Sequence, residues 1–172
     1  DLIELQSLVL RMVCERIPEA YGLDPMTDVQ VLTPMHKGEV GTVVLNRLLQ
    51  ERLNPDGREL IRGQRAYRVG DRILQLRNNY DKDVFNGDLG RVTGFDAEAE
   101  TLAAEFDGRA VEYDFDELDE IGLAYAISVH KSQGSEYPAV VMPVVSQHYM
   151  LLQRNLIYTG LTRARKLAVL MG

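Results

Sequence analysis

The stretch "LAYAISVHKSQGSEYPAVVMPVV", residues 123–145, decides the fold class. Its two ends, "LAYAISV" and "AVVMPVV", are short apolar runs of the kind that form buried strands. The polar segment between them carries an imidazole, an ammonium, a carboxamide, hydroxyls and a carboxylate within a few residues. A strand that ends in a polar, glycine-bearing loop is typical of open α/β sheets, which bind ligands at the carboxyl edge. The stretch therefore predicts an α/β fold with a ligand site at that edge.

The rest of both chain ends has the same α/β character. Residues 2–17 have the apolar spacing of an amphipathic helix, which Pro18 and the turn at 22–25 are expected to end. Further predicted elements are a strand at 28–34, a glycine-containing loop at 35–41, a helix at 42–54 with Thr42 as N-cap, a helix at 153–164 and a strand at 166–171.

The middle of the chain follows a different pattern. Between residues 67 and 123, short strands alternate with tight turns, and Asn86-Gly87 and Asp107-Gly108 are favoured hairpin signals. About five strands in this length make a small barrel or sandwich. We therefore predict an α/β domain at 1–62 and 122–172, interrupted by a small all-β domain at 63–121.

Composition limits the class of protein. The chain is 45% apolar, enough for a core, and its net charge of -7 argues mildly against a dedicated nucleic-acid binder. The acid is concentrated in residues 96–120, whereas the last 42 residues are basic. Cys14, the single cysteine, is expected to be a buried thiol in a reducing, cytoplasmic compartment. No membrane span or signal peptide is expected, and the helical start without Met suggests a piece of a longer protein.

Several familiar motifs are absent from the sequence. There is no G-x-x-x-x-G-K-S/T phosphate loop, so the chain is not expected to cradle a triphosphate by itself. There is also no Cys/His cluster with zinc spacing, no G-x-S-x-G elbow and no G-x-G-x-x-G, and no metal site is predicted. A nucleotide hydrolase that is complete in this chain is therefore not expected.

Two clusters carry groups that suit a phosphorylated ligand. In the loop after residue 127, hydroxyls and the imidazole of His130 can donate to phosphate or sugar oxygens, and Glu136 can accept from ribose hydroxyls. A structural hydrogen bond for His130 and a simple turn at Gly134 are the alternatives. In the helix predicted at 153–164, Arg163 stands out, while Arg165 and Lys166 could instead complement the helix dipole.

Four stretches together resemble a known family. "YAISVHKSQGSEYPAVVMPV" and "QRNLIYTGLTRARKLAVLMG" resemble motifs V and VI of superfamily 1 DNA helicases. "VQVLTPMHKGEVGTVVLN" is similar to the motif IV region of the RecD family, which includes the α subunit of exodeoxyribonuclease V, and "YRVGDRILQLRNNYDKDVFNGDLG" resembles the opening of that family's SH3-like insert. The resemblance covers residues 28–172, and the barrel motif favours a RecD-type over a UvrD-type helicase.

The resemblance implies the C-terminal part of such a helicase, a second RecA-like lobe without its own phosphate loop. ATP would bind between this lobe and a missing N-terminal lobe that supplies the phosphate loop and the Mg²⁺ ligand. Arg163 would be the catalytic trans-cleft arginine, and Tyr158 and Thr162 would position its helix. The resemblance implies nucleotide contacts from Gln133, Gly134, Glu136 and Arg163, and single-stranded DNA contacts from Thr33, Pro34, His36, Lys37, Ser128 and His130.

The resemblance also gives the insert a role in DNA binding. Asn79 and Tyr80 would face a strand of DNA, and Tyr80 and Phe85 could stack on bases. The alternative is that Phe85 belongs to the barrel core and Tyr80 is an ordinary loop residue. The acidic run at 96–120 is expected to be a solvated barrel face that points away from DNA.

Two main functional hypotheses follow. The first is the C-terminal lobe of an ATP-dependent DNA helicase, with 5′ to 3′ travel implied by the resemblance, and further subunits of a recombination or repair complex as possible partners. The second is an SH3-like module that binds a protein or DNA, with the α/β part as a scaffold without catalysis. A third, a nuclease role of the parent within a complex, has no metal-binding carboxylate cluster to support it.

Overall fold

The computed structural model describes residues 1–145 and 154–172, and the chain divides into two compact units. The first unit comprises Asp1–Leu53 and Tyr125–Gly172, and the second comprises Asn54–Ala124. Both boundaries differ from those expected at 62/63 and 121/122. The second unit begins earlier because β2 (Glu59–Arg62) pairs with β3 (Arg65–Arg68), and it ends later because β8 (Ile121–Leu123) pairs with β4 (Arg72–Gln75).

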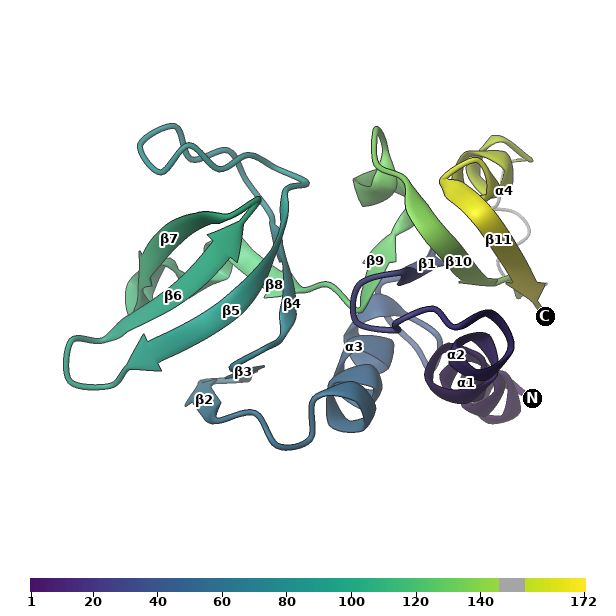
Figure 1. Ribbon diagram of the computed structural model, residues 1–172, viewed down its shortest axis with the longest axis horizontal. Coiled ribbons are helices and arrows are strands. Elements are labelled where there is room, and N and C mark those ends of the chain that lie inside the picture. Colours follow the sequence, from purple (N-terminus) through teal and green to yellow (C-terminus); the bar gives the residue numbers. More distant parts are fainter. Residues whose placement is uncertain (146–153) are drawn as a thin grey trace. The chain divides into compact units, whose positions relative to one another are not determined.

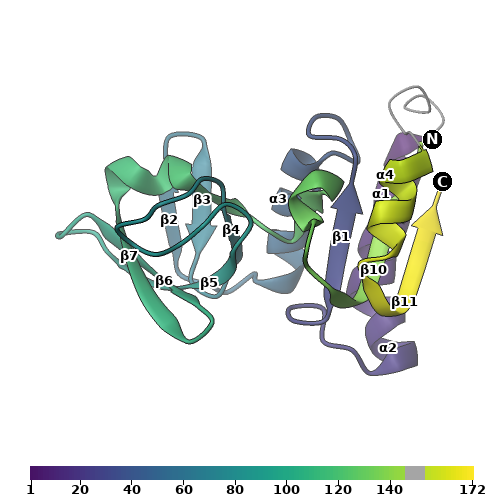
Figure 2. The same cartoon turned by 90° about the horizontal axis from the view of Figure 1, so that it is seen from above.

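The first unit is built on a parallel sheet, as the fold class predicted. Among the described residues this sheet has four strands in the order β11-β10-β1-β9. Figure 2 shows β1, β10 and β11 pointing the same way. The strands are β1 (Val29–Thr33), β9 (Ala126–Ser128), β10 (Tyr137–Pro143) and β11 (Ala164–Met171).

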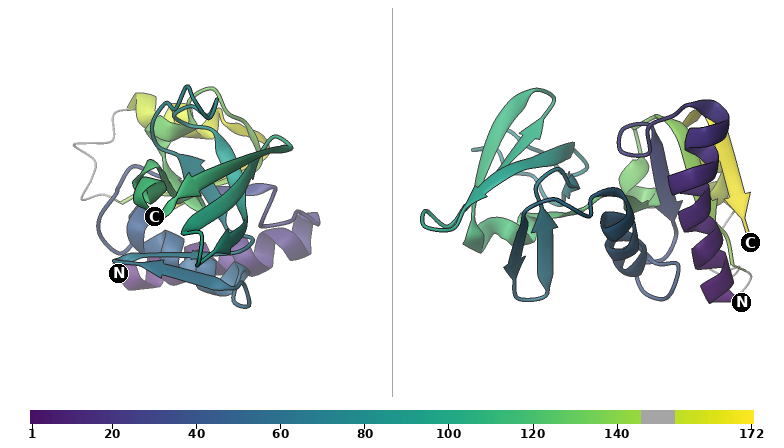
Figure 3. Two further views of the ribbon diagram at one scale, coloured as in Figure 1. Left: turned by 90° about the vertical axis from the view of Figure 1, so that its left-hand side faces the viewer. Right: turned by 60° about the horizontal axis from the view of Figure 1, so that its bottom comes forward.

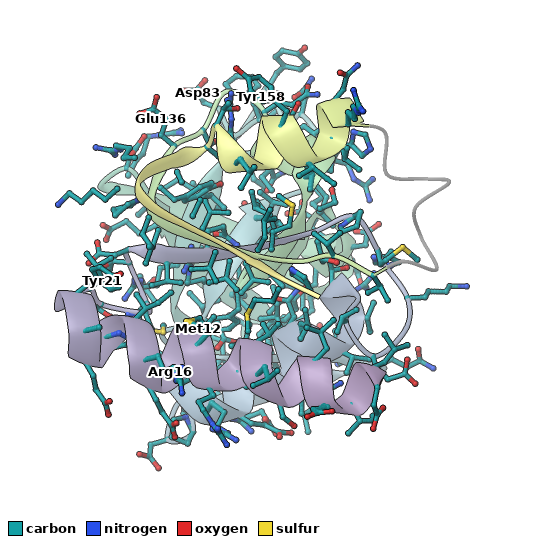
Figure 4. All side chains as sticks on the ribbon, turned by 90° about the vertical axis from the view of Figure 1, so that its right-hand side faces the viewer. Met12, Arg16, Tyr21, Asp83, Glu136 and Tyr158 are labelled. Atoms are coloured by element: carbon teal, nitrogen blue, oxygen red, sulfur yellow. The ribbon has the colours of Figure 1, made fainter. Side chains whose placement is uncertain are left out.

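Helices cover both faces of this sheet. The helix α4 (Arg154–Leu161) lies on one face and the N-terminal helix α1 (Leu2–Arg11) on the other (Figure 4). The helix α3 (Thr42–Leu53) holds the short strand β9 through Asn46, whose side chain donates to the carbonyl of Ala126 and accepts from its N–H, both at 2.8 Å. Thr42 is the first residue of α3 and not its N-cap, since the first helical hydrogen bond runs from the N–H of Leu45 to the carbonyl of Gly41.

The expectation that Pro18 ends the first helix is wrong, whereas the expected turn at 22–25 does end it. The helix continues from α1 through a π-helical turn, η1 (Met12–Arg16), into α2 (Ile17–Tyr21), and Figure 4 labels Met12, Arg16 and Tyr21 along it. The N–H of Ile17 donates to the carbonyl of Met12, five residues back, and Pro18 follows in the first turn of the next segment, where a missing N–H is tolerated. Gly22, with φ of 65°, ends the helix.

The second unit, which is described throughout, contains an antiparallel sheet with the order β7-β6-β5-β4-β8. Figure 3 shows β5 (Leu89–Asp96), β6 (Thr101–Phe106) and β7 (Arg109–Asp114) as a curled ribbon. The turn between β6 and β7 confirms the Asp-Gly hairpin signal, because Asp107 and Gly108 both have positive φ, at 50° and 76°. A 3-10 helix of six residues, η2 (Phe115–Glu120), follows β7.

Two predicted elements near the C-terminus have different bounds in the structure. The run "LAYAISV" is not one strand but two, because β8 belongs to the second unit and β9 to the first. The helix predicted at 153–164 ends at Leu161, and its first residue, Gln153, lies outside the described residues. Arg165 and Lys166 belong to β11, so the idea that they complement a helix end is wrong.

Candidate functional site

Strand register places the predicted site residues at opposite edges of the parallel sheet. Thr33 pairs with Ser128 at the carboxyl ends of β1 and β9, whereas Tyr137 pairs with Ala164 at the amino ends of β10 and β11. The polar segment after Ser128 therefore runs from one edge to the other (Figure 2). The expectation that the whole segment lies at the carboxyl edge is wrong, because the short 3-10 helix η3 (Val129–Ser132) leads the chain back before β10 begins.

The side of the sheet at which β10 and β11 begin is called the amino edge below. It brings together residues from the stretches that resemble motifs V and VI. The N–H of Tyr137 donates to the carbonyl of Arg163 at 2.8 Å, so the residues just before β10 and β11 are neighbours. Glu136 and Arg165 form an ion pair at 3.5 Å with both side chains more than half exposed. Figure 4 shows Glu136 close to the point where the chain leaves α4. Of the four residues expected to face a nucleotide, Glu136 and Arg163 therefore belong to adjoining segments at this edge, while Gln133 and Gly134 lie in the connection between η3 and β10.

Arg163 lies in the turn after α4 and is partly exposed. Its Nε donates to the carbonyl of Thr159 at 3.3 Å, and its Nη2 donates to the hydroxyl of Thr162 at 3.3 Å. In the described part of the chain no carboxylate lies within ion-pair distance of Arg163. The carbonyls at the C-terminal end of a helix carry partial negative charge, which stabilises a cation there. The guanidinium is thus held in place without being neutralised.

The neighbours expected to position this arginine contribute unequally. Thr162 contacts the guanidinium through its hydroxyl, as expected of a positioning residue. Tyr158 is 70% exposed and projects from the outer face of α4 (Figure 4), so its side chain does not support Arg163. The packing of α4 depends instead on Gly160, where an added Cβ would lie against the side chain of Met142 from β10.

The turn at Gln133 and Gly134, between η3 and β10, is open to solvent. Both residues are exposed, and Gly134 has φ of 79°, a conformation that favours glycine. A Cβ added at Gly134 would meet open space. A ligand can therefore approach the backbone closely here, which suits the phosphate contact expected of this turn.

At the carboxyl edge, the loop at 34–41 curls onto the start of α3. The side chain of Thr33 is buried and donates to the carbonyl of Val40 at 2.8 Å, so it closes the loop and does not present its hydroxyl to a ligand. A Cβ at Gly41 would lie 2.5 Å from the carbonyl oxygen of Lys37, which makes glycine necessary. The side chains of His36 and Lys37 are exposed, and Pro34 is half-buried.

The start of η3 gives one outward-facing group. The hydroxyl of Ser128 accepts from the N–H of Lys131 at 3.3 Å and caps the turn, while Ser132 is buried and donates to the carbonyl of Val129. His130 is exposed. Ser128 and Ser132 therefore shape the turn, and His130 is the side chain that this turn offers to a ligand.

In the second unit, the loop between β4 and β5 displays Tyr80. Its ring is 77% exposed and meets Phe85 edge-on, with ring centroids 5.6 Å apart. Phe85 is itself 36% exposed, so the alternative that it belongs to the barrel core is wrong. Asn79 faces inward: its amide donates to Glu120 at 3.0 Å, and its Oδ1 accepts from the N–H of Lys82 at 3.0 Å. Asn79 is thus an anchor of the loop that presents Tyr80.

Acidic residues of η2 hold this loop. Asp119 pairs with Arg77 at 2.6 Å, Glu117 pairs with Lys82 at 2.9 Å, and Glu120 is only 8% exposed. The expectation that the whole acidic run at 96–120 is a solvated face is therefore wrong for η2. Sequence reasoning missed Glu120, because in an acidic stretch nothing distinguishes a buried carboxylate from its exposed neighbours.

Hydrogen bonds connect this loop to a buried tyrosine hydroxyl in the barrel. Tyr113 donates to Oε1 of Gln75 at 2.7 Å, and Gln75 donates to the carbonyl of Arg77 at the start of the loop. Burial raises the pKa of Tyr113 and raises that of Tyr67 to about 12. Both hydroxyls therefore stay protonated near neutral pH and act as structural donors. Cys14, in the first unit, is half-buried, and burial raises the pKa of its thiol.

Within residues 1–145 and 154–172, no group of three or more His, Cys, Asp or Glu side chains is arranged to hold a metal ion. The helices in the same ranges are all too short or too polar to cross a membrane.

Comparison with protein families matches both units. Residues 45–106 match the ATP-dependent RecD-like DNA helicase SH3 domain, and residues 123–171 match the UvrD-like helicase C-terminal domain. Among curated proteins, the chain is 44% identical over 137 residues to the ATP-dependent RecD2 DNA helicase of Deinococcus radiodurans, covering 80% of this chain and 19% of that protein. It is 30% identical over 172 residues to the RecBCD enzyme subunit RecD of Mycolicibacterium smegmatis, covering 100% of this chain and 30% of the relative.

Solved structures show the same fold. A Pif1 helicase studied for unwinding at forked double-stranded DNA superposes with a TM-score of 0.62 at 18% identity, covering 96% of this chain and 46% of that chain. Pif1 from Bacteroides in complex with ADP-AlF3 and single-stranded DNA has a TM-score of 0.59 at 18% identity, covering 94% and 44%. The matches of both units and the similarity to the RecD2 and RecD relatives show that the chain belongs to the RecD-like helicases, as a C-terminal region with an SH3 domain and a UvrD-like C-terminal domain.

Proposed function

We propose that this chain is the second RecA-like lobe of an ATP-dependent DNA helicase and that it acts on a nucleotide held mainly by another lobe of the same parent. The chain spans 19% and 30% of the length of the RecD2 and RecD relatives, which leaves room for that lobe. One observation carries the proposal: Glu136 and Arg163, from separate motifs, directly precede two paired strands at one sheet edge.

In this proposal Arg163 stabilises the charge that develops on the transferred phosphoryl group. It suits the task because it is partly exposed, is held by Thr159 and Thr162, and has no carboxylate partner among the described residues. Gln133 and Gly134 would approach the phosphates. Glu136 would accept hydrogen bonds from the ribose, with Arg165 keeping its carboxylate in place.

ATP is the proposed substrate, and Mg²⁺ would neutralise charge on its phosphates. The Mg²⁺ ligands are expected in the other lobe. What this chain adds at the amino edge and in the connection leading to it is a cation, a carboxamide, a carboxylate and an open glycine turn, which fit the outer side of a bound nucleotide.

Single-stranded DNA is the proposed nucleic-acid substrate, and the parent helicase is proposed to translocate along it from 5′ to 3′. In the first unit, the exposed side chains that would reach its backbone are His36, Lys37 and His130, while Thr33, Pro34 and Ser128 shape the segments that present them. In the second unit, Tyr80 would stack on a base and Asn79 would hold its loop. A Pif1 helicase of the same fold has been solved with single-stranded DNA, which supports this proposal. RecD relatives described as RecBCD subunits make further subunits plausible partners.

The test is the substitution Arg163→Ala in the full-length parent. We expect ATP turnover to fall by at least about a hundredfold, because an arginine of this type acts on the transition state. Nucleotide affinity, measured by titration with a fluorescent ADP, should change by less than about threefold, since the main cradle is elsewhere. Arg163→Lys, which keeps the charge but loses the planar fork, should remain strongly impaired. An unchanged ATP turnover in Arg163→Ala would contradict the assignment of Arg163 as the catalytic arginine.

A further inference from the structure

The strands β2 and β3 form a separate two-stranded ribbon in the second unit (Figure 1). Leu60 and Tyr67 are paired across the ribbon, and both are buried in the core of the unit. Gly63, with φ of 63°, forms the turn at the tip. The ribbon is therefore fixed at its base by the core and ends in a tight, exposed turn.

This ribbon is basic in a unit that is otherwise acidic. Residues 58–68 contain four arginines and a single acidic residue, Glu59, whereas acidic residues outnumber basic ones over residues 69–124. Glu59 is already paired with Arg68 at 2.9 Å. In the described part of the chain, the remaining arginines of the ribbon have no carboxylate within ion-pair distance: Arg58, Arg62 and Arg65.

Aromatic rings contact two of these arginines, and the guanidinium of Arg58 also donates to the backbone carbonyl of Phe95. The guanidinium of Arg58 lies 4.0 Å from the ring centroid of Phe95, and that of Arg62 lies 4.9 Å from that of Phe115. Such contacts restrict the side chain without neutralising its charge. The guanidinium groups thus remain able to bind an anion, with less conformational freedom to lose.

Arg62 and Arg65 occupy directly opposed positions on the two strands. Like charges at directly opposed positions of an antiparallel pair destabilise it. The unit contains many carboxylates, but none lies within ion-pair distance of Arg62 or Arg65, so this repulsion is not offset. An anion bound from outside would remove it, and phosphate is an anion that guanidinium groups bind through paired hydrogen bonds.

We propose that the β2–β3 ribbon binds the phosphate backbone of duplex DNA through Arg58, Arg62 and Arg65. This inference rests on the proposed helicase function and adds a second contact to it. Single-strand sites combine cations with exposed aromatic rings for stacking. The ribbon has cations but no such ring, because Tyr67 is only 4% exposed, whereas Tyr80 supplies that ring in another loop of the same unit. A site with positive charge but no exposed aromatic ring suits duplex DNA, because the bases of a duplex are already stacked on one another.

The test compares two double variants of this 172-residue chain with equal loss of charge. Arg62→Gln/Arg65→Gln removes the opposed pair, and Arg11→Gln/Arg16→Gln removes exposed arginines of the N-terminal helix. Affinity is measured by fluorescence anisotropy with a blunt duplex and with a single strand of the same length. We expect the ribbon variant to lose duplex affinity by roughly tenfold or more, and the log–log salt slope to fall by about 1.8 for two phosphate contacts. The control should change less than about threefold.

Further variants separate charge from folding. Arg62→Lys/Arg65→Lys keeps both charges and should keep duplex affinity within about threefold. Arg65→Gln alone leaves both ring contacts intact, so it should fold normally and still weaken duplex binding by roughly threefold to tenfold.

Each opposing result has a clear meaning. Equal losses in the ribbon variant and the control would contradict a specific site. A loss of single-strand affinity as large as the loss of duplex affinity would assign the ribbon to the single strand and overturn the proposal. Absence of duplex binding by the unmodified chain at low salt would also overturn it. None of these outcomes affects the Arg163→Ala test, so failure here and failure of the proposed function are distinguishable.

Discussion

The two units present their loops by different means. In the parallel unit, the loop at 34–41 is held by the backbone and by uncharged hydroxyls: the N–H groups of Thr42 and Val43 donate to the carbonyls of Met35 and His36, and the hydroxyl of Thr33 donates to the carbonyl of Val40. In the small antiparallel unit, the loop that presents Tyr80 also has backbone hydrogen bonds, but charged side chains of η2 hold it in addition. Backbone contacts follow from strand order and chain length, whereas side-chain contacts depend on particular residues far apart in the sequence. We therefore expect the loop that presents Tyr80 to be sensitive to substitution of single distant side chains.

The largest effect is expected at Asn46 in the parallel unit. Asn46→Ala would leave the buried N–H and carbonyl of Ala126 without their partner, which costs about 1–3 kcal/mol for each group and about 2–6 kcal/mol in all. Hydrogen exchange in peptides of β1 and β9 should accelerate, while peptides of the second unit serve as an internal reference. Arg47→Ala, at the exposed neighbouring position, should stay within about 0.5 kcal/mol. Equal effects of both substitutions would contradict the role of Asn46.

A smaller effect is expected at Glu120 in the antiparallel unit. Glu120→Ala removes the acceptor for Asn79 and should destabilise the loop by about 1–3 kcal/mol. The N–H groups of Asn79 and Val84, which donate to each other's carbonyls, report on the loop through hydrogen exchange. Glu120→Gln keeps an acceptor and should retain most of the protection. If both variants exchange like the unmodified chain, the carboxylate does not hold the loop.

The two loops should also differ in how they bind single-stranded DNA. Tyr80→Ala removes a stacking ring worth about 1–3 kcal/mol, a loss of roughly fivefold to a hundredfold in affinity. The salt dependence of binding should stay the same, because no phosphate contact is lost. Titration of labelled single strands at several salt concentrations measures both quantities. A Tyr158→Ala control removes an equally exposed ring and should leave the affinity unchanged.

The smallest effect is expected at Lys37. Lys37→Ala should weaken single-strand binding a few-fold and reduce the log–log salt slope by about 0.7, the value for one phosphate contact. The same titrations provide the measurement. A salt slope unchanged in Lys37→Ala would show that this exposed cation does not contact the phosphate backbone. If the affinity of the unmodified chain for single strands does not depend on salt concentration, the alternative of a protein-binding module is favoured instead.

Much of the architecture could be predicted from periodicity and turn residues. The parallel unit, the inserted small barrel and the Asp107-Gly108 hairpin all follow from local patterns. The continuation of the first helix past Pro18 could not be predicted, because it depends on a π-helical turn that shifts the hydrogen bonds by one residue. Likewise, local apolarity could not reveal that "LAYAISV" is divided between two units.

The candidate site was only partly predictable for a related reason. Residue types identify polar groups such as His130 and Glu136, but not the sheet edge at which each one lies. That depends on η3, a turn of four residues whose direction is not encoded in any repeating pattern. Thr33 and Asn79 have the residue types of ligand-binding groups, yet their side chains are satisfied inside the fold. The buried partner Glu120 gave no signal at all in its acidic surroundings.

The most direct test of the central claim compares two neighbouring arginines in the full-length parent. Arg163 and Arg165 lie next to the same sheet edge, but within the described ranges only Arg165 is paired with a carboxylate, that of Glu136. At saturating ATP and single-stranded DNA, we expect Arg163→Ala to lower turnover by at least about a hundredfold and Arg165→Ala by less than about tenfold. Equal losses in the two variants, or full turnover in Arg163→Ala, would contradict the claim that this lobe supplies the catalytic cation.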